Sequence, residues 1–559
     1  MYENSFKLST LTYERFKIDS FEKEGHKIIK EFKESKSGEE QFLIHKKYYE
    51  LIKKMSTARI LAQLRHDCNV ADKFYEEEQK YYDKISPKVT AFENEYKKEL
   101  LNTKFRSYME SKIGKIAFKD LEFDLKSFDK SIISLKQKEN SLMSEYSKLL
   151  AEIKIDFKGE TLNLSLLGKY LTSEDRNIRI ETVNARSRVL EKAKDKLDDI
   201  YDKMVKNRTE QAKKLGFHNY VELAYYIMGR TTYGINEVRN FRNQVKKYLV
   251  PFASKLHEER KNRLELNKLD SVDEGIYFIN GNPVPVGTAQ DIFKAGMKMY
   301  SELSKETKEF FEFMLNHELF DVLGRPNKAD GGYMDMLYTF KAPIIFANFN
   351  GTSGDVDVIT HECGHAFQGF ITRNDEIMEH NNIKMETAET HSMSMEFFAE
   401  KWMELFFGNR ADDYRKMHLE DAIAFIPYGC MVDEFQEIIY SKPELTKKER
   451  LKVWQDLEKQ YKPHLNFEND SFQKEGRRWQ LQRHIYVCPF YYIDYCLAQT
   501  CAIQFKIKMD EDFNNAWNKY IDFCYESAKD TFQNMLHNVG LQSPFEDGFM
   551  KKLIFKLDN

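Results

Sequence analysis

Long stretches in the first half of the chain mix charged and apolar residues in the manner of amphipathic helices. The segment "EYKKELLNTKFRSYMESKIG" is one example, rich in the helix formers Lys, Glu and Leu. Pro87 is the only proline among the first 250 residues, and the other ten follow later. Because proline removes a backbone donor and clashes with the preceding turn, its scarcity predicts long helices there. The charges are then the solvated faces of these helices.

Strand patterns are few. The run "IYFINGNPVPV" has two β-prone halves around Asn280-Gly281, which predicts a hairpin. The run "APIIFANFNGT" predicts a strand over residues 344–349. We therefore expect a mainly α fold with a small β-sheet.

A helix is predicted directly after the second of these runs. Asn350-Gly351 forms a tight turn, and Thr352 and Asp355 follow at the spacing of a capping box. The helix should start near Ser353. The small sheet is therefore expected beside this helix.

The motif "HECGH" lies about two turns into the predicted helix. His361 and His365 are four positions apart, so they share a face, about 6 Å apart along the axis at ~1.5 Å per residue. Their imidazoles can converge on one zinc ion at about 2.0–2.1 Å. Glu362 is rotated by about 100° from His361, so it can reach a water on the ion without being a ligand. One rigid turn thus supplies two ligands and a general base.

The alternative is a pair of histidines packed in a buried helix without a metal. Val358, Ile359, Ala366, Phe367 and Phe370 give the helix apolar sides, which indicates burial. Two imidazoles and a carboxylate buried without partners would cost several kcal/mol. A zinc ion supplies a partner, so we favour the metal site.

A catalytic zinc site usually has three protein ligands and one open position, so a third ligand is expected downstream. The segment "METAETHSMSMEFFAEKWMELFFG" predicts a helix from Met385 to near Gly408. Glu389, Glu396 and Glu400 share one stripe of it, whereas His391 points to another side. Spacing alone does not choose among the glutamates, and a solvated surface stripe is the alternative. The candidate ligands are Glu386, Glu389, His391, Glu396 and Glu400.

Composition narrows the class of protein. The chain has 559 residues, 42% of them hydrophobic, which is more than one small domain holds. The 86 Lys and Arg against 90 Asp and Glu leave no basic excess for nucleic acid. We see no run long enough to span a bilayer and no signal peptide, so no membrane partner is expected. Seven cysteines without a CxxC pair favour a reducing cytoplasm over a disulfide framework.

The zinc motif and the glutamates after it resemble a known family. "HECGHAFQGF", followed 24 residues after its second histidine by Glu389 and then by Glu396, resembles the oligoendopeptidase F and thimet-oligopeptidase family of zinc metallopeptidases, in its Pz-peptidase-like branch. In that family the third zinc ligand is the first glutamate of an E-x6-E pattern on the next long helix. The resemblance places the pattern on "ETHSMSME" and implies Glu389 as the ligand. It implies Glu396 as the residue that orients a ligand.

Other stretches resemble the same family. "NRTEQAKKLGFHNYVELAYYIMGRTTY" resembles the entry into its catalytic region, and "GGYMDMLYTFKAPIIFANFNGTSGDVDVITHECGH" its edge strand along bound peptide, leading into the zinc helix. The likeness covers roughly residues 170–545, whereas the first 170 resemble it only as a charged helical lobe. It implies two helical lobes that enclose a deep substrate channel. We expect an N-terminal helical lobe at residues 1–170 and a catalytic zinc metallopeptidase domain at 171–559.

The tyrosine-rich segment "HIYVCPFYYIDYCLAQ" resembles the one that contacts substrate in this family. Peptide hydrolysis forms a tetrahedral oxyanion, which a phenol or imidazole donor beside the metal can stabilise. The resemblance implies this role for the histidine and tyrosines here, and we favour His484, Tyr492 and Tyr495. Tyr486 and Tyr491 stay alternatives for the oxyanion donor. Ordinary core packing is the competing interpretation for any one of the 31 tyrosines.

The resulting hypothesis is a cytoplasmic zinc endopeptidase that cleaves short unstructured peptides. One zinc ion per chain is held by His361, His365 and Glu389, and Glu362 is the general base. Two alternatives stay open. One is a zinc carboxypeptidase of another helical HExxH family, and the other is a non-catalytic helical protein with a structural metal.

Overall fold

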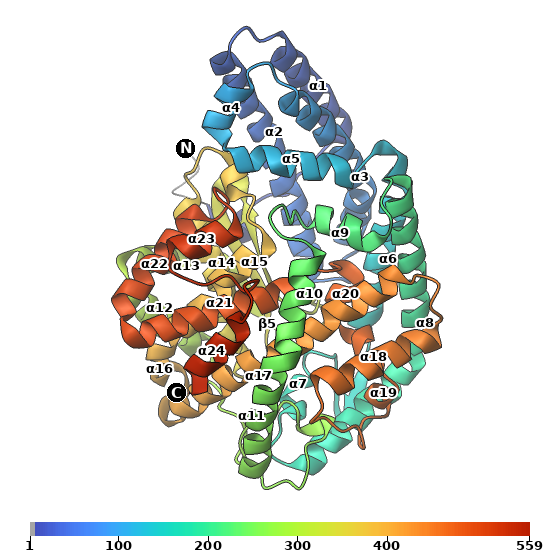
Figure 1. Ribbon diagram of the computed structural model, residues 1–559, viewed down its shortest axis with the longest axis vertical. Helices are drawn as coiled ribbons and strands as arrows, with labels where there is room; N and C mark the ends of the chain where they lie inside the picture. The colour runs from blue at the N-terminus through green and yellow to red at the C-terminus, as the bar shows by residue number, and fades with distance from the viewer. Residues whose placement is uncertain (1–5, 559) are drawn as a thin grey trace.

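The computed structural model describes residues 6–558 as a predominantly helical molecule (Figure 1). Its tapered upper part is built by the first five helices, and α6 continues from them down one side. Helices of 31 and 29 residues confirm the long helices predicted for this half, and Pro87 lies inside the second of them. The helices are α1 (Ile18–Glu34), α2 (Gly38–Cys68), α3 (Lys73–Leu101), α4 (Arg106–Ile113), α5 (Lys115–Ser127) and α6 (Ile133–Ala151).

A two-stranded antiparallel sheet and a second group of helices follow. The longest helix of the group has 39 residues and packs along α6. The strands are β1 (Ile155–Phe157) and β2 (Glu160–Leu162). The helices are α7 (Gly168–Leu171), α8 (Arg176–Lys214), α9 (Tyr220–Ile227), α10 (Ile235–Gln244), α11 (Val250–Arg263), α12 (Ala289–Leu303) and α13 (Lys305–Asn316).

The hairpin predicted at Asn280-Gly281 is wrong. Those residues form an irregular turn, and no strand flanks it. Pro283 and Pro285 each lack the backbone donor that a second strand would need. The Arg410 side chain instead binds the free carbonyls of the turn, with 2.8 Å from Nη2 to the oxygen of Gly281.

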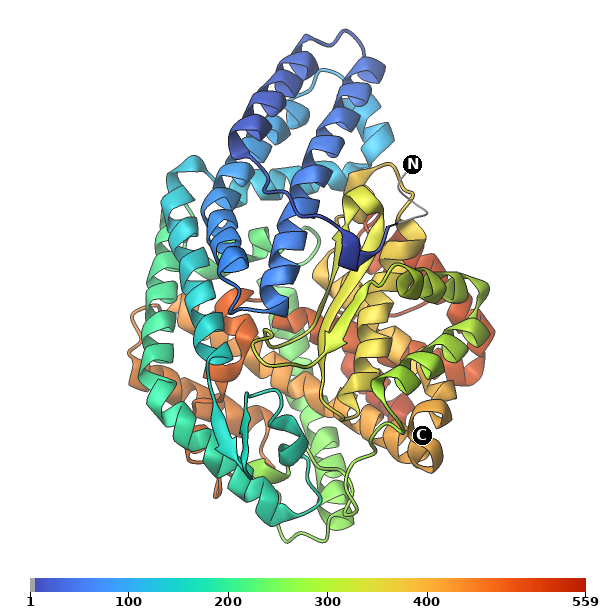
Figure 2. The same cartoon turned by 180° about the vertical axis from the view of Figure 1, so that it is seen from behind.

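The second sheet stands beside the candidate metal helix, as predicted. Its order is β3-β5-β4, with β3 parallel and β4 antiparallel to the central strand. The edge of β4 that faces away from β5 pairs with no strand among the described residues, and α2 packs beside β4 (Figure 2). The strands are β3 (Phe320–Leu323), β4 (Tyr333–Leu337) and β5 (Ala342–Phe349).

Helix α14 (Gly354–Thr372) begins where the sequence predicts, but not by the predicted capping box. Its N-cap, Ser353, makes no side-chain cap bond. The Asp355 carboxylate instead accepts the amides of Asn350 and Gly351, at 2.8 and 2.9 Å. This carboxylate therefore ties the end of β5 to the start of α14, because the tight turn aims both amides at it.

The helix predicted from Met385 to Gly408 is broken. It is regular to Ala399, passes through a tighter turn over Glu400–Trp402 and resumes to Phe407, after which Gly408 has φ 55°. The remaining helices complete the fold. They are α15 (Met385–Ala399), α16 (Glu404–Phe407), α17 (Ala411–Ser441), α18 (Lys447–Tyr461), α19 (Ser471–Lys474), α20 (Arg483–Val487), α21 (Tyr492–Glu511), α22 (Phe513–Glu526), α23 (Phe532–Asn538) and α24 (Phe549–Asp558).

One buried core joins the two halves of the chain. Leu61 and Tyr146, from the first 170 residues, belong to the same apolar cluster as Tyr201 and Trp479. The mainly α fold with a small sheet is confirmed, whereas the division at residue 170 stays a prediction. Within residues 6–558, no helix has the length and apolar character needed to cross a membrane.

Arg208 links three distant parts of this core. It is fully buried on α8, and its Nε lies 2.6 Å from Glu139 on α6. Its guanidinium also donates to the Tyr440 hydroxyl at 2.7 Å and to the Tyr486 carbonyl, next to the tyrosine-rich segment. Burial alone would raise the pKa of Glu139, but Lys136 and Arg208 hold it below its usual value. The pair therefore stays ionised in the interior.

Replacing Arg208 should unfold the protein much more readily. Arg208→Met leaves the buried Glu139 carboxylate with Lys136 and Gln211 but without its buried cationic partner, which costs about 3 kcal/mol. The midpoint of urea unfolding measures the loss. Lys452→Met is the control, because it removes an exposed pair with Asp456 and should change stability by only about 0.5 kcal/mol. Equal midpoints for the two variants would contradict this role of Arg208.

Candidate active site

Two helices bring the three predicted ligands together. His361 and His365 lie on α14 and Glu389 on α15. The Nε2 atoms of the two histidines lie 3.4 and 3.3 Å from the same Oε2 of Glu389. Tetrahedral ligands held at about 2.0–2.1 Å from one ion are separated by about 3.3–3.4 Å. The three side chains therefore have the spacing of a zinc site.

A glycine allows the two helices to meet so closely. A Cβ on Gly364 would lie 2.6 Å from the Cα of Ser392 and 2.9 Å from the carbonyl oxygen of His391. Any larger residue at position 364 would push α15, and Glu389 with it, away from the histidines. Glu389 is 1% exposed and held by two further donors, Ser392 Oγ at 2.9 Å and the Tyr491 hydroxyl. Hydrogen bonds from Ser392 and Tyr491 therefore fix the Glu389 carboxylate beside the two histidines.

The site is built to receive positive charge. Burial alone would lower the pKa of His361, but Glu389 and Glu396 raise it well above its usual value. Among the described residues, one group of side chains is spaced to hold a metal ion. It consists of His361, His365 and Glu389. A cation at their centre would replace the protons that these carboxylates otherwise attract. The donor set of two imidazoles and one carboxylate fits zinc.

A hydrogen-bonded chain of Glu396, His418 and Glu400 holds the His361 ring on the side away from the cluster. The Nδ1 of this ring lies 2.6 Å from Glu396 Oε1, so Nε2 is the atom left to face the centre. Glu396 Oε2 lies 2.8 Å from His418 Nε2, and His418 Nδ1 lies 3.0 Å from Glu400 Oε1. Burial alone would lower the pKa of His418, but the two glutamates raise it well above its usual value. The His418 ring is therefore a cation, and both of its nitrogens donate. It joins Glu396 and Glu400, two members of the predicted glutamate stripe.

Glu362 lies next to His361 on α14 and is half-buried. Among the described residues its carboxylate has no hydrogen-bond partner, and burial raises the pKa of this group. A Cβ on Gly332, just before β4, would lie 3.4 Å from Glu362 Oε1. The open edge of the sheet thus begins next to this carboxylate.

The tyrosine-rich segment contacts the cluster through Tyr491, which donates to Glu389. His484 Nε2 lies 3.4 Å from the Tyr495 hydroxyl, and the Tyr492 ring centre lies 4.9 Å from that of His484. Gln482 donates from Nε2 to His484 Nδ1 at 3.0 Å, while its Oε1 accepts from Tyr428. Nδ1 is therefore the acceptor and Nε2 carries the proton. Burial lowers the pKa of His484 to about 4, so the ring is neutral near pH 7.

Tyr486 and Tyr491 occupy different environments. Tyr486 is fully buried, stacks on Tyr146 and donates to the carbonyl of Leu197 at 3.2 Å, so it is a core residue. Tyr491 donates to Glu389, the predicted third ligand. Its spacing of four residues from Tyr495 was the only signal in the sequence. His418, 22 residues after Glu396, had no signal at all.

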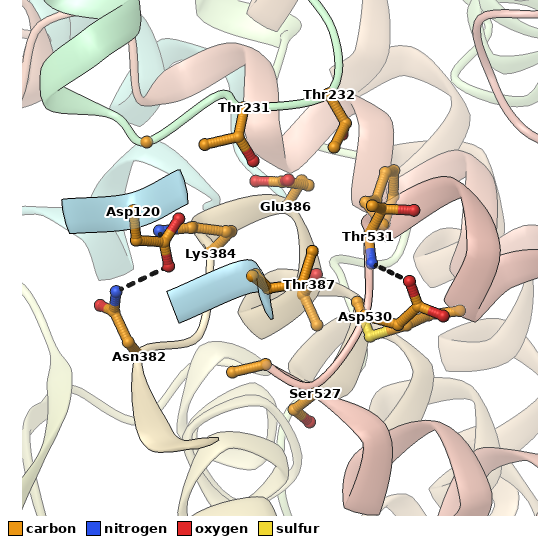
Figure 3. A pocket seen from close by; sticks show the side chains of 15 residues that line it. Asp120, Thr231, Thr232, Asn382, Lys384, Glu386, Thr387, Ser527, Asp530 and Thr531 are labelled. Carbon is orange, nitrogen blue, oxygen red and sulfur yellow. Dashed lines mark hydrogen bonds and ion pairs between the residues drawn. The ribbon is translucent and has the colours of Figure 1, made fainter. Parts of the chain in front are cut away.

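The other two candidate ligands lie away from the cluster. His391 turns to the far side of α15, where Nε2 lies 3.1 Å from Ser527 Oγ. Glu386 lines a hollow of about 20 Å³ at the start of α15, together with Asp120 and Lys384 (Figure 3). Asp120 pairs with Lys384 at 3.0 Å and accepts from Asn382 at 3.1 Å. The hollow holds about one water molecule, so it is not a substrate site.

Two models of one peptidase family match this chain. The family model described as the peptidase M3 N-terminal domain matches residues 8–128, and that of peptidase family M3 matches residues 287–553. The family likeness thus extends into the first 170 residues, where the sequence alone showed only a charged helical lobe. A search of curated proteins found no match.

Solved structures match along the whole chain. An oligoendopeptidase F structure is 42% identical, with a TM-score of 0.98, and the match covers 99% of this chain and 98% of that one. PZ peptidase A with an inhibitor is also 42% identical, with the same coverage of both chains and a TM-score of 0.97. An oligoendopeptidase F from Bacillus anthracis str. Ames is 39% identical, again with 99% and 98% coverage, and has a TM-score of 0.93. The chain therefore belongs to peptidase family M3, and it is a peptidase of the oligoendopeptidase kind.

Proposed function

We propose that this peptidase is a zinc-dependent endopeptidase that cleaves internal bonds of short, unstructured peptides. The observation that carries the proposal is the spacing of 3.3 and 3.4 Å at which His365 and His361 approach one oxygen of Glu389. These three residues would hold the ion. Bound zinc supplies Lewis acidity, which polarises a carbonyl and makes water more acidic.

Glu362 is the general base of the proposal. It accepts a proton from the attacking water and passes it to the nitrogen of the leaving amine. Its carboxylate makes no hydrogen bond among the described residues, so it can turn from one to the other. Burial raises its pKa, which brings the carboxylate closer to the pH at which proton transfer in both directions is efficient.

His484 and Tyr495 are the proposed oxyanion donors, with Tyr492 beside them. The neutral His484 ring presents its Nε2 proton toward the Tyr495 hydroxyl, and both groups are donors on the same segment of the chain. Donors fixed before the reaction stabilise developing charge without reorganising. Tyr491 acts on Glu389 and is a positioning residue.

The open edge of β4 is the proposed seat of the peptide. An extended chain can pair with its free backbone groups, and such pairing needs an unfolded substrate. Three ligands and an unpaired Glu362 support a catalytic site over a structural one, which is closed by four ligands. The carboxypeptidase alternative would need a fixed partner for the free carboxylate of the substrate.

The setting we propose is the cytoplasm. All seven cysteines are free thiols, which is the state that a reducing compartment maintains. Short peptides are the proposed partners, with neither nucleic acid nor a membrane involved.

Metal analysis should find about one zinc per chain. The reason is the single cluster of three ligands in the described structure. Removing the metal with a chelator should abolish peptide cleavage, and adding zinc should restore it. Cleavage that survives complete metal removal would end the proposal.

Two conservative variants should separate the base from the ligand. Glu362→Gln fills the same space but accepts no proton, so it should keep zinc and lose at least about a hundredfold in kcat. Glu389→Gln removes a charged ligand, so it should lower zinc affinity at least about tenfold. Metal titration and peptide kinetics on both proteins provide the measurement. Equal zinc loss in the two variants would contradict the assigned roles.

Substrate length should limit cleavage. Peptides of roughly 5–20 residues with both ends blocked should be cut internally, because an extended segment pairs with β4 and no free terminus is required. Folded proteins and intact casein should resist, since an enclosed channel admits only short chains. Mass spectrometry of the products locates the cleaved bonds. Rapid degradation of casein would exclude the channel, and a need for a free carboxylate would favour a carboxypeptidase.

A further inference from the structure

A pocket of about 370 Å³ opens at the end of β4 that lies away from Glu362. Its walls come from α2, from β4, from the end of α14 and from the loop between α14 and α15. The apolar lining is formed by half-buried or buried side chains, and a glycine leaves space on the α14 side. These residues are Tyr49, Met334, Met336, Gly369, Met378 and Ile383.

The pocket adjoins the face of α14 that carries the two predicted histidine ligands. Gly369 follows His365 by four residues and His361 by eight, so all three share one face of α14. A Cβ on Gly369 would lie 3.7 Å from Met336 Sδ and 4.0 Å from Met334 Cε. Because Gly332 stands beside Glu362 and Met336 beside Gly369, β4 and α14 run side by side in the same direction.

This geometry relates the pocket to the bound peptide. Gly369 lies about 6 Å beyond His365 along the helix, which is about two residues of an extended chain at ~3.4 Å each. A peptide that pairs antiparallel with β4, the more stable arrangement, has its N-terminal part at Met336. The side chains of this peptide alternate between the two faces of the sheet. In the same way, Met334 and Met336 lie on one face of β4 and Asp335 lies on the other.

The charged side chains that line the pocket, Arg373 and Asp375 among them, already have polar partners. Lys46 lies 2.5 Å from Glu376, Lys53 lies 2.9 Å from Glu50, and Lys341 donates to Asn374 at 3.0 Å. A charged group of the substrate would have to displace one of these partners. The floor offers apolar carbon and sulfur instead, and the volume exceeds that of any single side chain.

We infer that this pocket is a specificity site for a large apolar side chain, such as Phe, Leu or Met. That side chain belongs to the second, third or fourth residue on the N-terminal side of the cleaved bond. The inference rests on the proposed endopeptidase function. It means that Gly369, Met334 and Met336 determine which peptides are preferred, although they lie away from the proposed catalytic residues.

The test uses zinc-loaded enzyme and end-blocked octapeptides with one cleavable bond. Each of the three upstream positions is varied among Gly, Leu, Phe, Arg and Glu, and kcat/KM and the cut site are measured. At one of these positions, Phe or Leu should exceed Gly, Arg and Glu by about tenfold or more. Gly369→Leu fills the pocket and should bring this ratio close to one, while zinc content stays at that of the parent protein.

Two more variants complete the experiment. Met336→Ala widens the pocket from the opposite wall and should shift the preference toward larger side chains, so it also reports on the pocket if Gly369→Leu does not fold. Leu323→Ala is the matched control, because Leu323 is 58% exposed on β3, the other edge strand of the sheet. It should leave the ratio unchanged.

Three results would overturn the inference. The first is a kcat/KM that does not depend on the three upstream residues. The second is a ratio that Gly369→Leu and Met336→Ala both leave unchanged. The third is an effect of these variants on residues after the cleaved bond, which would mean that the peptide runs parallel to β4. If no octapeptide is cut at all, the proposed function itself fails, and this outcome is distinct from cleavage without the preference.

Discussion

The contact between α14 and α15 at Gly364 is the constraint on which the predicted metal site depends. Two ligands come from one helix and the third from the other, so their spacing is the spacing of the helices. A Cβ at position 364 would meet backbone atoms of α15 at 2.6 and 2.9 Å, where no side-chain rotation can relieve the clash. Glycine carries an entropic cost in a helix, and here the close approach offsets it.

Buried charge around this contact is arranged in compensating pairs. Glu389 accepts from Ser392 and Tyr491, and Glu396 lies between His361 and His418. Each carboxylate is thus fixed from more than one direction, which suits a site whose ligands must keep their places. The one acid in the site without a hydrogen-bond partner in the described structure is Glu362, the residue that the proposed reaction needs to move a proton. Rigid ligands and a free base are therefore separated by a single position in the sequence.

The sheet extends the site into a surface for an extended chain. Strand β4 starts beside Glu362 and ends at the pocket around Gly369, so the proposed reaction site and the proposed specificity pocket lie along one strand. Helix α2 of the first half supplies Tyr49 to that pocket. The Tyr49 hydroxyl also donates to Glu379, in the loop that joins α14 and α15. The two halves of the chain thus meet at the proposed specificity pocket. A shared apolar core holds them together.

The sequence by itself determined what depends on local spacing. The helical first half, the strand before α14, the start of that helix and the pairing of His361 with His365 all follow from periods of a few residues, and the structure agrees. Glu389 was reached only through the likeness to a family, because a helical stripe does not say which of its members faces a neighbour.

Only the tertiary structure decided the rest. His418 lies on another helix from Glu396, and Tyr491 meets Glu389 across 102 positions of the chain. At Asn280-Gly281 the nearby prolines Pro283 and Pro285 already argue against a second strand, but only the structure shows that Arg410 from a distant segment donates to the carbonyl of Gly281. Contacts of this sort depend on how helices pack, and packing is set by the shape of many side chains at once. No short stretch of sequence contains that information.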